Sequence, residues 1–528
     1  MFNPPWGGDA IKESLHFVTV HNATIVRAAA ITAALAAVGS FLGLIRDLLL
    51  ARWFGATGST DAFLVAWTVP ETVSPLLVEG AMALVMIPIF VRATASGASL
   101  AGVVRTTLPR LAAPLILLSA GVMVGAPWLV HVLAPGIAEP ALAVRCTRVA
   151  AVTVLAFGIA GYLGAALRSV HVFGPPAAIY AVFNIGIVAT MAALHQPLGV
   201  FSAAIGLAVG AVLMVAVQVP SLRRHLGSAT NSPVIPVALG AFVPVAVFTI
   251  ARQGQVFVER FLGSELGAGT ISHLNYAQNV VQVPMVASVI VATVTFPVLA
   301  RTAVTGDTAA ARERTAWDLR VVAAIVLACS AYLIAFAPIL VSALFEHGLF
   351  TPADTAATTA IIRVYTLGLL GQAFVVTLTR AFFSAGRPNW FPALAMAVGL
   401  AATAGLSVLL APVWHAMGIA AGNAAGITVT AALLLRGAPL EQRRYSIGRP
   451  VIAMVIAAAL ATGVGLAASP TLNAALPPLL AASVGAVVVG LAFVAASTLA
   501  GADEPAHIMR AALRRRPRTG LERPGNAV

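Results

Sequence analysis

The sequence predicts an all-α polytopic membrane protein. Its 528 residues are 60% hydrophobic and only 9% charged, and the mean hydropathy is +0.96. Soluble domains carry about 25% charged residues, so no soluble fold buries this much apolar chain. The apolar runs are long and continuous, whereas the strands of a membrane β-barrel are ~10-residue segments of alternating polarity. We therefore expect a chain that crosses the membrane many times as helices.

About fourteen apolar runs approach the ~20 residues that a transmembrane helix needs. They lie near 28–54, 61–91, 106–133, 141–167, 175–195, 199–220, 233–262, 269–300, 320–345, 356–384, 389–411, 414–435, 450–469 and 476–500. Residues 1–27 are mixed and polar and lack the pattern of a cleaved signal peptide. We expect them to form a cytoplasmic N-terminal segment that precedes an uncleaved first span.

The positive residues predict the orientation. With the N-terminus inside, 24 of the 31 Lys and Arg residues lie on the cytoplasmic side, which favours this arrangement with both termini cytoplasmic. The net charge of +13 fits a membrane surface better than nucleic acid, because the arginines flank apolar spans. The basic tail, 501–528, carries Arg514–Arg516 and Arg518, and we expect it to bind anionic lipid. A specific partner for the tail is the alternative.

The chain repeats itself at an offset of about 210 residues. Three pairs of motifs share this offset: Arg52–Gly55 with Arg260–Gly263, Pro88–Arg92 with Pro297–Arg301, and Gly136 and Pro140 with Gly348 and Pro352. The period covers six spans, and an even number restores the orientation, so the halves are parallel repeats as in alternating-access transporters. The predicted layout is a first six-helix lobe (28–222), a second six-helix lobe (233–436) and an extra helix pair (449–500).

Charges inside the spans are the strongest functional candidates. A charge at mid-bilayer costs at least ~2.5 kcal/mol and usually faces a wet cavity or the bundle interior. The predicted substrate-binding residues are Arg46, Asp47, Asp61, Glu79, Arg252, Glu259 and Arg260. Arginines suit a phosphate-bearing substrate because the guanidinium group binds phosphate oxygens bidentately. The alternatives are structural ion pairs for Arg46 and Arg252, and an Arg260 side chain that snorkels outward.

Patterns of catalytic or metal-binding residues are missing from the sequence. It has no HExxH, Walker or GxSxG motif, and Cys146 and Cys329 are isolated. We therefore predict no enzyme, no cofactor and no metal site, and we expect isolated histidines such as His273 to be structural or interfacial. Any coupling ion would use Asp47, Asp61, Glu71, Glu79 or Glu259, because no carboxylate occurs between Asp354 and Glu441.

Several motifs together resemble one known family. They are Gly43–Ala56 with its Arg46-Asp47 pair, Thr60–Phe63, Pro70, Glu79–Ala81, Pro88–Ile89, Leu274–Ala277 with Pro284, Leu344–Thr351 and Arg380–Gly386. The chain resembles the MurJ/MviN family of lipid II flippases along nearly all of residues 24–500. The resemblance implies a fourteen-helix fold of the multidrug/oligosaccharidyl-lipid/polysaccharide exporter superfamily. It also implies that a lipid-linked glycan, undecaprenyl-pyrophosphate-linked muropeptide, is flipped from the cytoplasmic to the outer leaflet.

The resemblance also assigns individual positions. The Arg-Asp pair of the family's first helix is Arg46-Asp47, and its second-helix glutamate is Glu79. Three cations of the family are replaced, at Ser40, Ser74 and Asn279, and we expect Arg252 to supply a compensating charge. Two alternatives stay open. One is an exporter of another lipid-linked saccharide or small amphiphile. The other is a non-transporting scaffold that binds cell-wall synthesis proteins.

Overall fold

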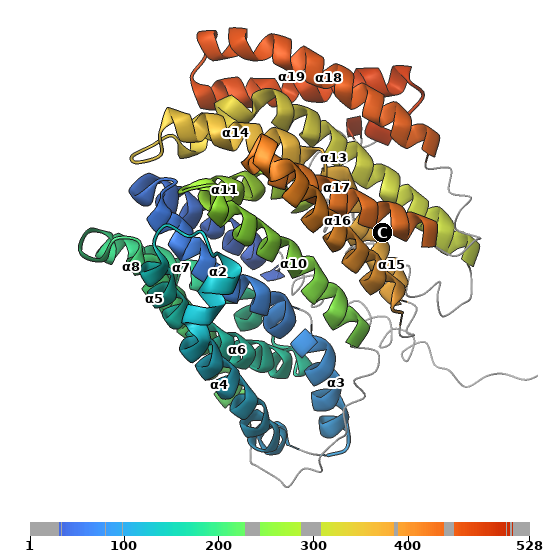
Figure 1. Cartoon of the computed structure of the whole chain (residues 1–528). Coiled ribbons are helices and arrows are strands. Elements are labelled where there is room, and N and C mark those ends of the chain that lie inside the picture. The colour runs from blue at the N-terminus through green and yellow to red at the C-terminus, as the bar shows by residue number, and fades with distance from the viewer. Residues whose placement is uncertain are drawn as a thin grey trace, which may run out of the picture. The chain divides into compact units, whose positions relative to one another are not determined.

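The computed structural model describes most of the chain as helix. The described residues are 31–32, 34–79, 81–97, 99–226, 243–286, 308–384, 389–437, 448–502, 504–506 and 509–510. Within these ranges the regular structure is helical throughout and contains no strand (Figure 1), which confirms the all-α class. The predicted N-terminal segment 1–27 and the tail arginines Arg514–Arg518 lie outside the described residues.

The described helices lie near the predicted spans, but several spans are divided into two helices and parts of 233–262 and 269–300 lie outside the described residues. After a first helix, Ala34–Phe54, they are α2 (Gly58–Ser74), η1 (Pro75–Glu79), α3 (Ala81–Ala95), α4 (Leu100–Leu133), α5 (Pro140–Ala150), α6 (Val152–Ser169), α7 (Gly174–Leu198), α8 (Phe201–Ala216), α9 (Val219–His225), α10 (Val243–Glu265), α11 (Thr270–Gln282), α13 (Thr308–Phe345), α14 (Pro352–Thr366), α15 (Leu369–Ser384), α16 (Phe391–Trp414), α17 (Ala416–Gly437), α18 (Gly448–Ala475) and α19 (Pro478–Leu499).

Local sequence explains where several of these helices begin. The Thr57 hydroxyl accepts the Thr60 N–H and caps α2, and the Ser99 hydroxyl accepts the Gly102 N–H and caps α4. Proline starts α5 and α19, where its fixed φ suits the first turn and its missing N–H leaves no bond unmade. Short polar caps and prolines therefore divide the long apolar runs.

Criteria of helix length and hydropathy give fewer membrane spans than the apolar runs of the sequence predict. Among the described residues, ten helices are long and apolar enough to cross a membrane. The pair Pro352–Thr366 and Leu369–Phe383, bent by 48°, makes eleven if it is counted as one broken span. The count of fourteen therefore stays a prediction, whereas a multi-pass membrane protein is confirmed.

The predicted second span, 61–91, is not one continuous α-helix. The α-helix ends at Ser74, the π-helical turn η1 runs from Pro75 to Glu79, and α3 begins at Ala81. Pro75 explains the break, because it has no N–H to donate to the carbonyl of Glu71 four residues earlier. π-helical turns are frequent at functional sites, and this one borders the cavity described below.

The described contacts divide the chain into two compact units. The first comprises Met1–Asn279, Leu344–Thr358 and Pro388–Gly422. Within it α7 packs along α8, where a Cβ on Gly186 would lie only 2.8 Å from the Cα of Gly210. In the same unit α10 packs along α16, and α2 packs against α5. These close helix contacts position the site.

The second unit comprises Val280–Ala343, Thr359–Arg387 and Asn423–Val528. Here α18 and α19 lie side by side (Figure 1), and Tyr332 of α13 donates a 3.1 Å hydrogen bond to the carbonyl of Ala482 in α19. Arg320 of α13 pairs with Glu504 at 3.1 Å. The two predicted lobes were derived from the sequence repeat, and their bounds differ from those of the two contact units. The lobes stay a prediction.

Candidate functional site

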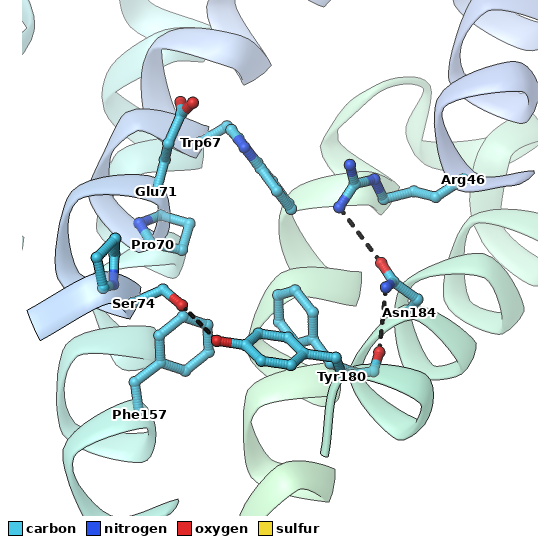
Figure 2. A pocket seen from close by; sticks show the side chains of 10 residues that line it. Arg46, Trp67, Pro70, Glu71, Ser74, Phe157, Tyr180 and Asn184 are labelled. Atoms are coloured by element: carbon cyan, nitrogen blue, oxygen red, sulfur yellow. Dashed lines mark hydrogen bonds between the residues drawn. The ribbon is translucent and has the colours of Figure 1, made fainter. Parts of the chain in front are cut away.

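A cavity of about 230 Å³ lies inside the first unit, beside Arg46. Its lining comes from the first helix, α2, η1, α6 and α7, and consists of Arg46, Trp67, Pro70, Glu71, Ser74, Pro75, Phe157, Tyr180, Phe183 and Asn184. Figure 2 shows Arg46 pointing toward Asn184 and Ser74 toward Tyr180, whereas the Glu71 carboxylate points away from these groups. Pockets for drug-sized ligands measure about 300–1,000 Å³, so this cavity has room for part of a large substrate only.

Arg46 is held on three sides. Its Nε donates to Oδ1 of Asp47 at 2.8 Å, and its Nη2 lies 2.7 Å from the same oxygen as an ion pair. Its Nη1 donates to Oδ1 of Asn184 at 3.3 Å. The guanidinium carbon lies 4.1 Å from the ring centroid of Trp67, which is a cation–π distance. The structural ion pair with Asp47 is therefore present. The same side chain nevertheless lines the cavity, 14% exposed.

Asp47 is fully engaged by its neighbours. Its Oδ1 accepts from Arg46, and its Oδ2 accepts from Nδ2 of Asn279 in α11 at 2.9 Å. Asn279 is one of the positions at which the family resemblance leads one to expect a cation. An amide here stabilises the carboxylate as a hydrogen-bond donor without adding positive charge.

Ser74 stands at another position with an expected cation. Its hydroxyl and the Tyr180 hydroxyl form a 2.9 Å hydrogen bond at the cavity wall (Figure 2). Asn184, one turn after Tyr180, donates from Nδ2 to the carbonyls of Gly39 and Tyr180 at 3.0 and 3.1 Å. A hydroxyl group thus occupies the wall position of Ser74, where the resemblance implies arginine.

A buried ion pair joins α2 to α10. Nη2 of Arg260 lies 3.6 Å from Oε2 of Glu71, and the Arg260 side chain has no exposed surface. Arg260 therefore does not snorkel outward. The backbone carbonyl of Glu71, which Pro75 cannot serve, accepts instead from Nε2 of Gln253 at 2.7 Å. One residue of α2 thus contacts α10 through both its side chain and its backbone.

Asp61, in the first turn of α2, does not line this cavity. Its carboxylate contacts the start of α11. Its Oδ2 accepts the Gly269 N–H at 2.6 Å, and its Oδ1 accepts the N–H and hydroxyl of Ser272 at 2.7 and 2.6 Å. A carboxylate in this position satisfies the free N–H groups at a helix N-terminus and interacts favourably with the helix dipole. Asp61 is 2% exposed, so these three bonds form inside the protein.

The contacts around Asp61 extend to the segment before α14. The Leu349 N–H donates to the Arg52 carbonyl at 2.9 Å, and the Tyr276 hydroxyl donates to the Gly55 carbonyl at 3.3 Å. Gly348 has φ +68°, and a Cβ there would collide with the Arg52 carbonyl, so only glycine fits. We call Arg52, Gly55, Asp61, Gly269, Ser272, Tyr276, Gly348 and Leu349 the Asp61 cluster.

The cluster joins residues that the sequence repeat relates. Asp61 and Gly269 are separated by 208 residues, which is the offset of the repeated Arg52–Gly55 motif. The glycines of the third motif pair behave alike: Gly348 packs on the end of the first helix, and Gly136 donates to Oγ of Ser264 near the end of α10 at 3.2 Å. Equivalent positions meet when two repeats are related by a twofold axis, and such a pattern fits the predicted duplication.

His273 is less isolated than its sequence context suggested. Its Nε2 lies 2.9 Å from Oδ1 of Asp354, and Oδ2 of Asp354 accepts from the N–H and hydroxyl of Thr351 at the start of α14. The pair fits a structural histidine, as expected, and it joins α11 to α14.

The remaining predicted site residues are dispersed. Arg252 is exposed on α10, and Glu259 on the same helix is fully buried. The backbone of Glu79 ends η1, and its side chain lies outside the described residues. Of the seven predicted residues, Arg46 lines the cavity, while Asp47 and Arg260 pair with residues that line it. That all seven bind substrate stays a prediction.

Sequence reasoning missed most of the cavity wall. Trp67, Phe157, Tyr180 and Asn184 lie in ordinary apolar runs, and no spacing distinguishes them from helix-packing residues. Glu71 did carry a signal, because an intramembrane carboxylate is a functional candidate by default. Among the described residues, no group of His, Cys, Asp and Glu side chains could hold a metal ion.

Comparison with known proteins identifies the family. The family model described as "Lipid II flippase MurJ" matches residues 50–489. Lipid II flippase MurJ of Burkholderia cenocepacia is 25% identical over 65% of this chain and 70% of its own. The probable lipid II flippase MurJ of Rhizobium meliloti is 27% identical over 83% of this chain and 87% of its own.

Solved structures agree on the fold. A lipid II flippase MurJ in an inward closed conformation matches with a TM-score of 0.71 at 19% identity, over 92% of this chain and 99% of that one. An inward-facing multidrug resistance MATE transporter of the MOP superfamily matches with a TM-score of 0.62 at 13% identity, over 75% of this chain and 92% of that one. With a family model that spans most of the sequence and a shared fold, this chain belongs to the MurJ family of lipid II flippases.

Proposed function

We propose that the chain is an alternating-access flippase for lipid II, a polyprenyl-pyrophosphate-linked peptidoglycan precursor, and moves it from the cytoplasmic to the outer leaflet. Membership of the family supports the substrate class. The observation that carries the proposal is Arg46, a paired cation that lines a cavity inside an apolar helical bundle. A guanidinium group in such a place can bind a phosphate-bearing headgroup while the lipid tail stays in the bilayer.

The proposal has a definite topology. Both termini lie in the cytoplasm, two six-helix lobes rock about the headgroup, and the last helix pair is an appendage. The Asp61 cluster then lies on the outer side, where it closes the path while the cavity opens inward. The partners are the lipid-linked substrate and membrane lipids, with anionic lipid at the basic tail and cell-wall synthesis proteins as further partners. The chain acts as a transporter and not as an enzyme.

One observation favours a second candidate, an exporter of another lipid-linked saccharide. Ser74, Asn184 and Tyr180 give the cavity hydroxyl and amide groups beside aromatic rings, and Asn279 stands where the resemblance implies a cation. Such a wall suits a sugar at least as well as a pyrophosphate. A different glycan on the same polyprenyl-pyrophosphate carrier would use Arg46 in the same way.

Complementation separates these candidates. The chain is expressed in a bacterium whose own lipid II flippase is depleted. Growth without lysis is expected if lipid II is the substrate. A protein that reaches the membrane in normal amounts but does not prevent lysis would favour the other lipid-linked saccharide, and accumulation of that glycan after deletion in the native host would identify it.

A further inference from the structure

Glu71 lies between the cavity and a buried arginine. It lines the cavity, and its side chain is 25% exposed. Behind it, Arg260 has no exposed surface, and none of its three guanidinium nitrogens makes a hydrogen bond with the described residues. A buried charge needs a counterion or hydrogen bonds. For Arg260 that counterion is Glu71, 3.6 Å away.

Two other buried carboxylates of the first unit, Asp47 and Asp61, are already engaged. Asp47 accepts from Arg46 and Asn279, and Asp61 accepts three hydrogen bonds at the start of α11. In contrast, Oε2 of Glu71 accepts no hydrogen bond within the described residues. Among the described lining residues, Glu71 is the acidic side chain, and its buried Oε2 faces Arg260.

Two pairs of opposite charge lie at the cavity among the described residues. Arg46 pairs with Asp47, and Arg260 pairs with Glu71. Among the described residues, the charged groups that face Glu71 are Arg260 of α10 and Arg46 and Asp47 of the first helix. The lining residues that come from α6 and α7 are uncharged. An anionic headgroup that binds beside Arg46 adds negative charge next to Glu71. Two adjacent negative groups repel, and the repulsion favours a proton on one of them.

We propose that Glu71 is an exchangeable counterion: when an anionic headgroup enters the cavity, the ligand's negative charge replaces that of Glu71 as counterion to Arg260, and the Glu71 carboxylate takes up one proton from water. The proposal rests on the proposed function, because it needs an anionic substrate. Without the ligand, protonation of Glu71 would leave the buried Arg260 without a counterion. The proton and the anion are therefore expected to bind together. Transport of the anion is thereby coupled to proton uptake on the cavity side and proton release where the anion leaves.

Linkage gives a measurable consequence. If binding takes up one proton, the affinity for the anion rises as the pH falls, by up to about tenfold per pH unit. The Glu71→Gln variant carries a permanently neutral group and loses this dependence. The matched control is Glu504→Gln, which removes a carboxylate that also pairs with an arginine, Arg320, but belongs to the second unit.

The experiment is infrared difference spectroscopy of the purified protein in lipid nanodiscs at fixed neutral pH. Farnesyl pyrophosphate serves as the lipid-linked probe and inorganic pyrophosphate as the free one, and binding of each is measured separately by equilibrium dialysis. The expected result is a protonated-carboxyl carbonyl band that appears with bound farnesyl pyrophosphate in wild type and Glu504→Gln, and not in Glu71→Gln. The same band with inorganic pyrophosphate would show that the headgroup alone suffices.

Each of the other outcomes contradicts either the counterion exchange or the anionic substrate class. If the probe binds without the band, or if Glu71→Gln shows the same band, the exchange is wrong and the proposed function stands. If neither probe binds to wild type, the anionic substrate class fails, and the exchange fails with it. Because Glu71→Gln leaves Arg260 without its counterion, the double variant Glu71→Gln/Arg260→Met serves as a second test. It is expected to fold and to bind the probe without proton uptake.

Discussion

The Asp61 cluster and the cavity wall both place charges inside an apolar bundle, but they stabilise them in opposite ways. Asp61 is surrounded by donors from one short segment, the Gly269 and Ser272 N–H groups and the Ser272 hydroxyl. Arg260 and Glu71 rely on each other across two helices, at 3.6 Å, and some of their polar atoms have no hydrogen-bond partner among the described residues. The first arrangement is complete without a ligand, and the second is not.

From this difference we infer that the charge at Asp61 is structural and that the charges at the cavity are functional. A carboxylate whose oxygens all accept hydrogen bonds from helix N–H groups is a fixed part of the fold, because any movement leaves several donors unsatisfied. An ion pair with free oxygens and nitrogens can exchange partners at a lower cost. The comparison predicts that mutations at the Asp61 cluster change stability first, while mutations at the cavity change transport first.

The largest effect is expected from Arg46→Ala. It removes the cation that lines the cavity, and a charge-assisted pair with phosphate corresponds to roughly a 10–100-fold loss of affinity. Complementation of the flippase-depleted strain should be abolished while the amount of protein in the membrane is normal. Arg148→Ala, which removes an exposed arginine of α5, is the control and should grow normally. Full growth with Arg46→Ala would contradict the prediction that mutations at the cavity change transport first.

The ion pair between α2 and α10 should show strong coupling in stability. Glu71→Gln leaves the fully buried Arg260 without a counterion, and breaking a buried pair costs about 3–5 kcal/mol. The double variant Glu71→Gln/Arg260→Met removes both charges and should recover most of that loss. Thermal unfolding in detergent measures each variant. If the losses in Glu71→Gln and in the single variant Arg260→Met add up to the loss in the double variant, the pair does not stabilise the protein.

Asp61→Ala is expected to lower stability by about 3 kcal/mol, because it leaves the buried donors of Gly269 and Ser272 unsatisfied. Asp61→Asn keeps an acceptor oxygen and should lose less. Unfolding temperatures of the purified variants test the order wild type, Asp61→Asn, Asp61→Ala. A transport defect in Asp61→Asn at unchanged unfolding temperature would instead support the predicted role of Asp61 in binding substrate.

The smallest effect is expected at His273. Its side chain is 17% exposed, and its partner Asp354 keeps two hydrogen bonds from Thr351 after the imidazole is removed. His273→Ala should therefore lower stability by only about 1 kcal/mol. Growth in the complementation assay should be unchanged. A loss as large as that of Asp61→Ala would place His273 among the residues that close this end of the bundle.

The sequence predicted the elements far better than their contacts. Apolar runs and prolines locate the helices because burial in lipid leaves the backbone only helical solutions in a chain of this composition. The Arg46-Asp47 pair was also accessible, since both residues are charged and adjacent within a span. The break at Pro75 was not predicted, although a proline within an apolar run allows it.

The pairing of distant charges could not be derived in the same way. Gln253 and Glu71 are separated by 182 residues, and no periodicity links α10 to α2. The Asp61–Gly269 contact is the exception, because its separation of 208 residues equals the repeat offset. Equivalent positions of a duplicated chain meet near the axis that relates the halves. The repeat offset could therefore have predicted this contact.

Translocation by the purified protein tests the central claim most directly. Wild type and Arg46→Ala are reconstituted in liposomes with fluorescent lipid II, and a membrane-impermeant quencher reports the fraction in the outer leaflet over time. The account predicts that wild-type protein exchanges lipid II between leaflets and that Arg46→Ala exchanges it at the rate of protein-free liposomes. Equal translocation by the two proteins, or none by a folded wild type, would contradict the assignment of the Arg46 cavity to this substrate.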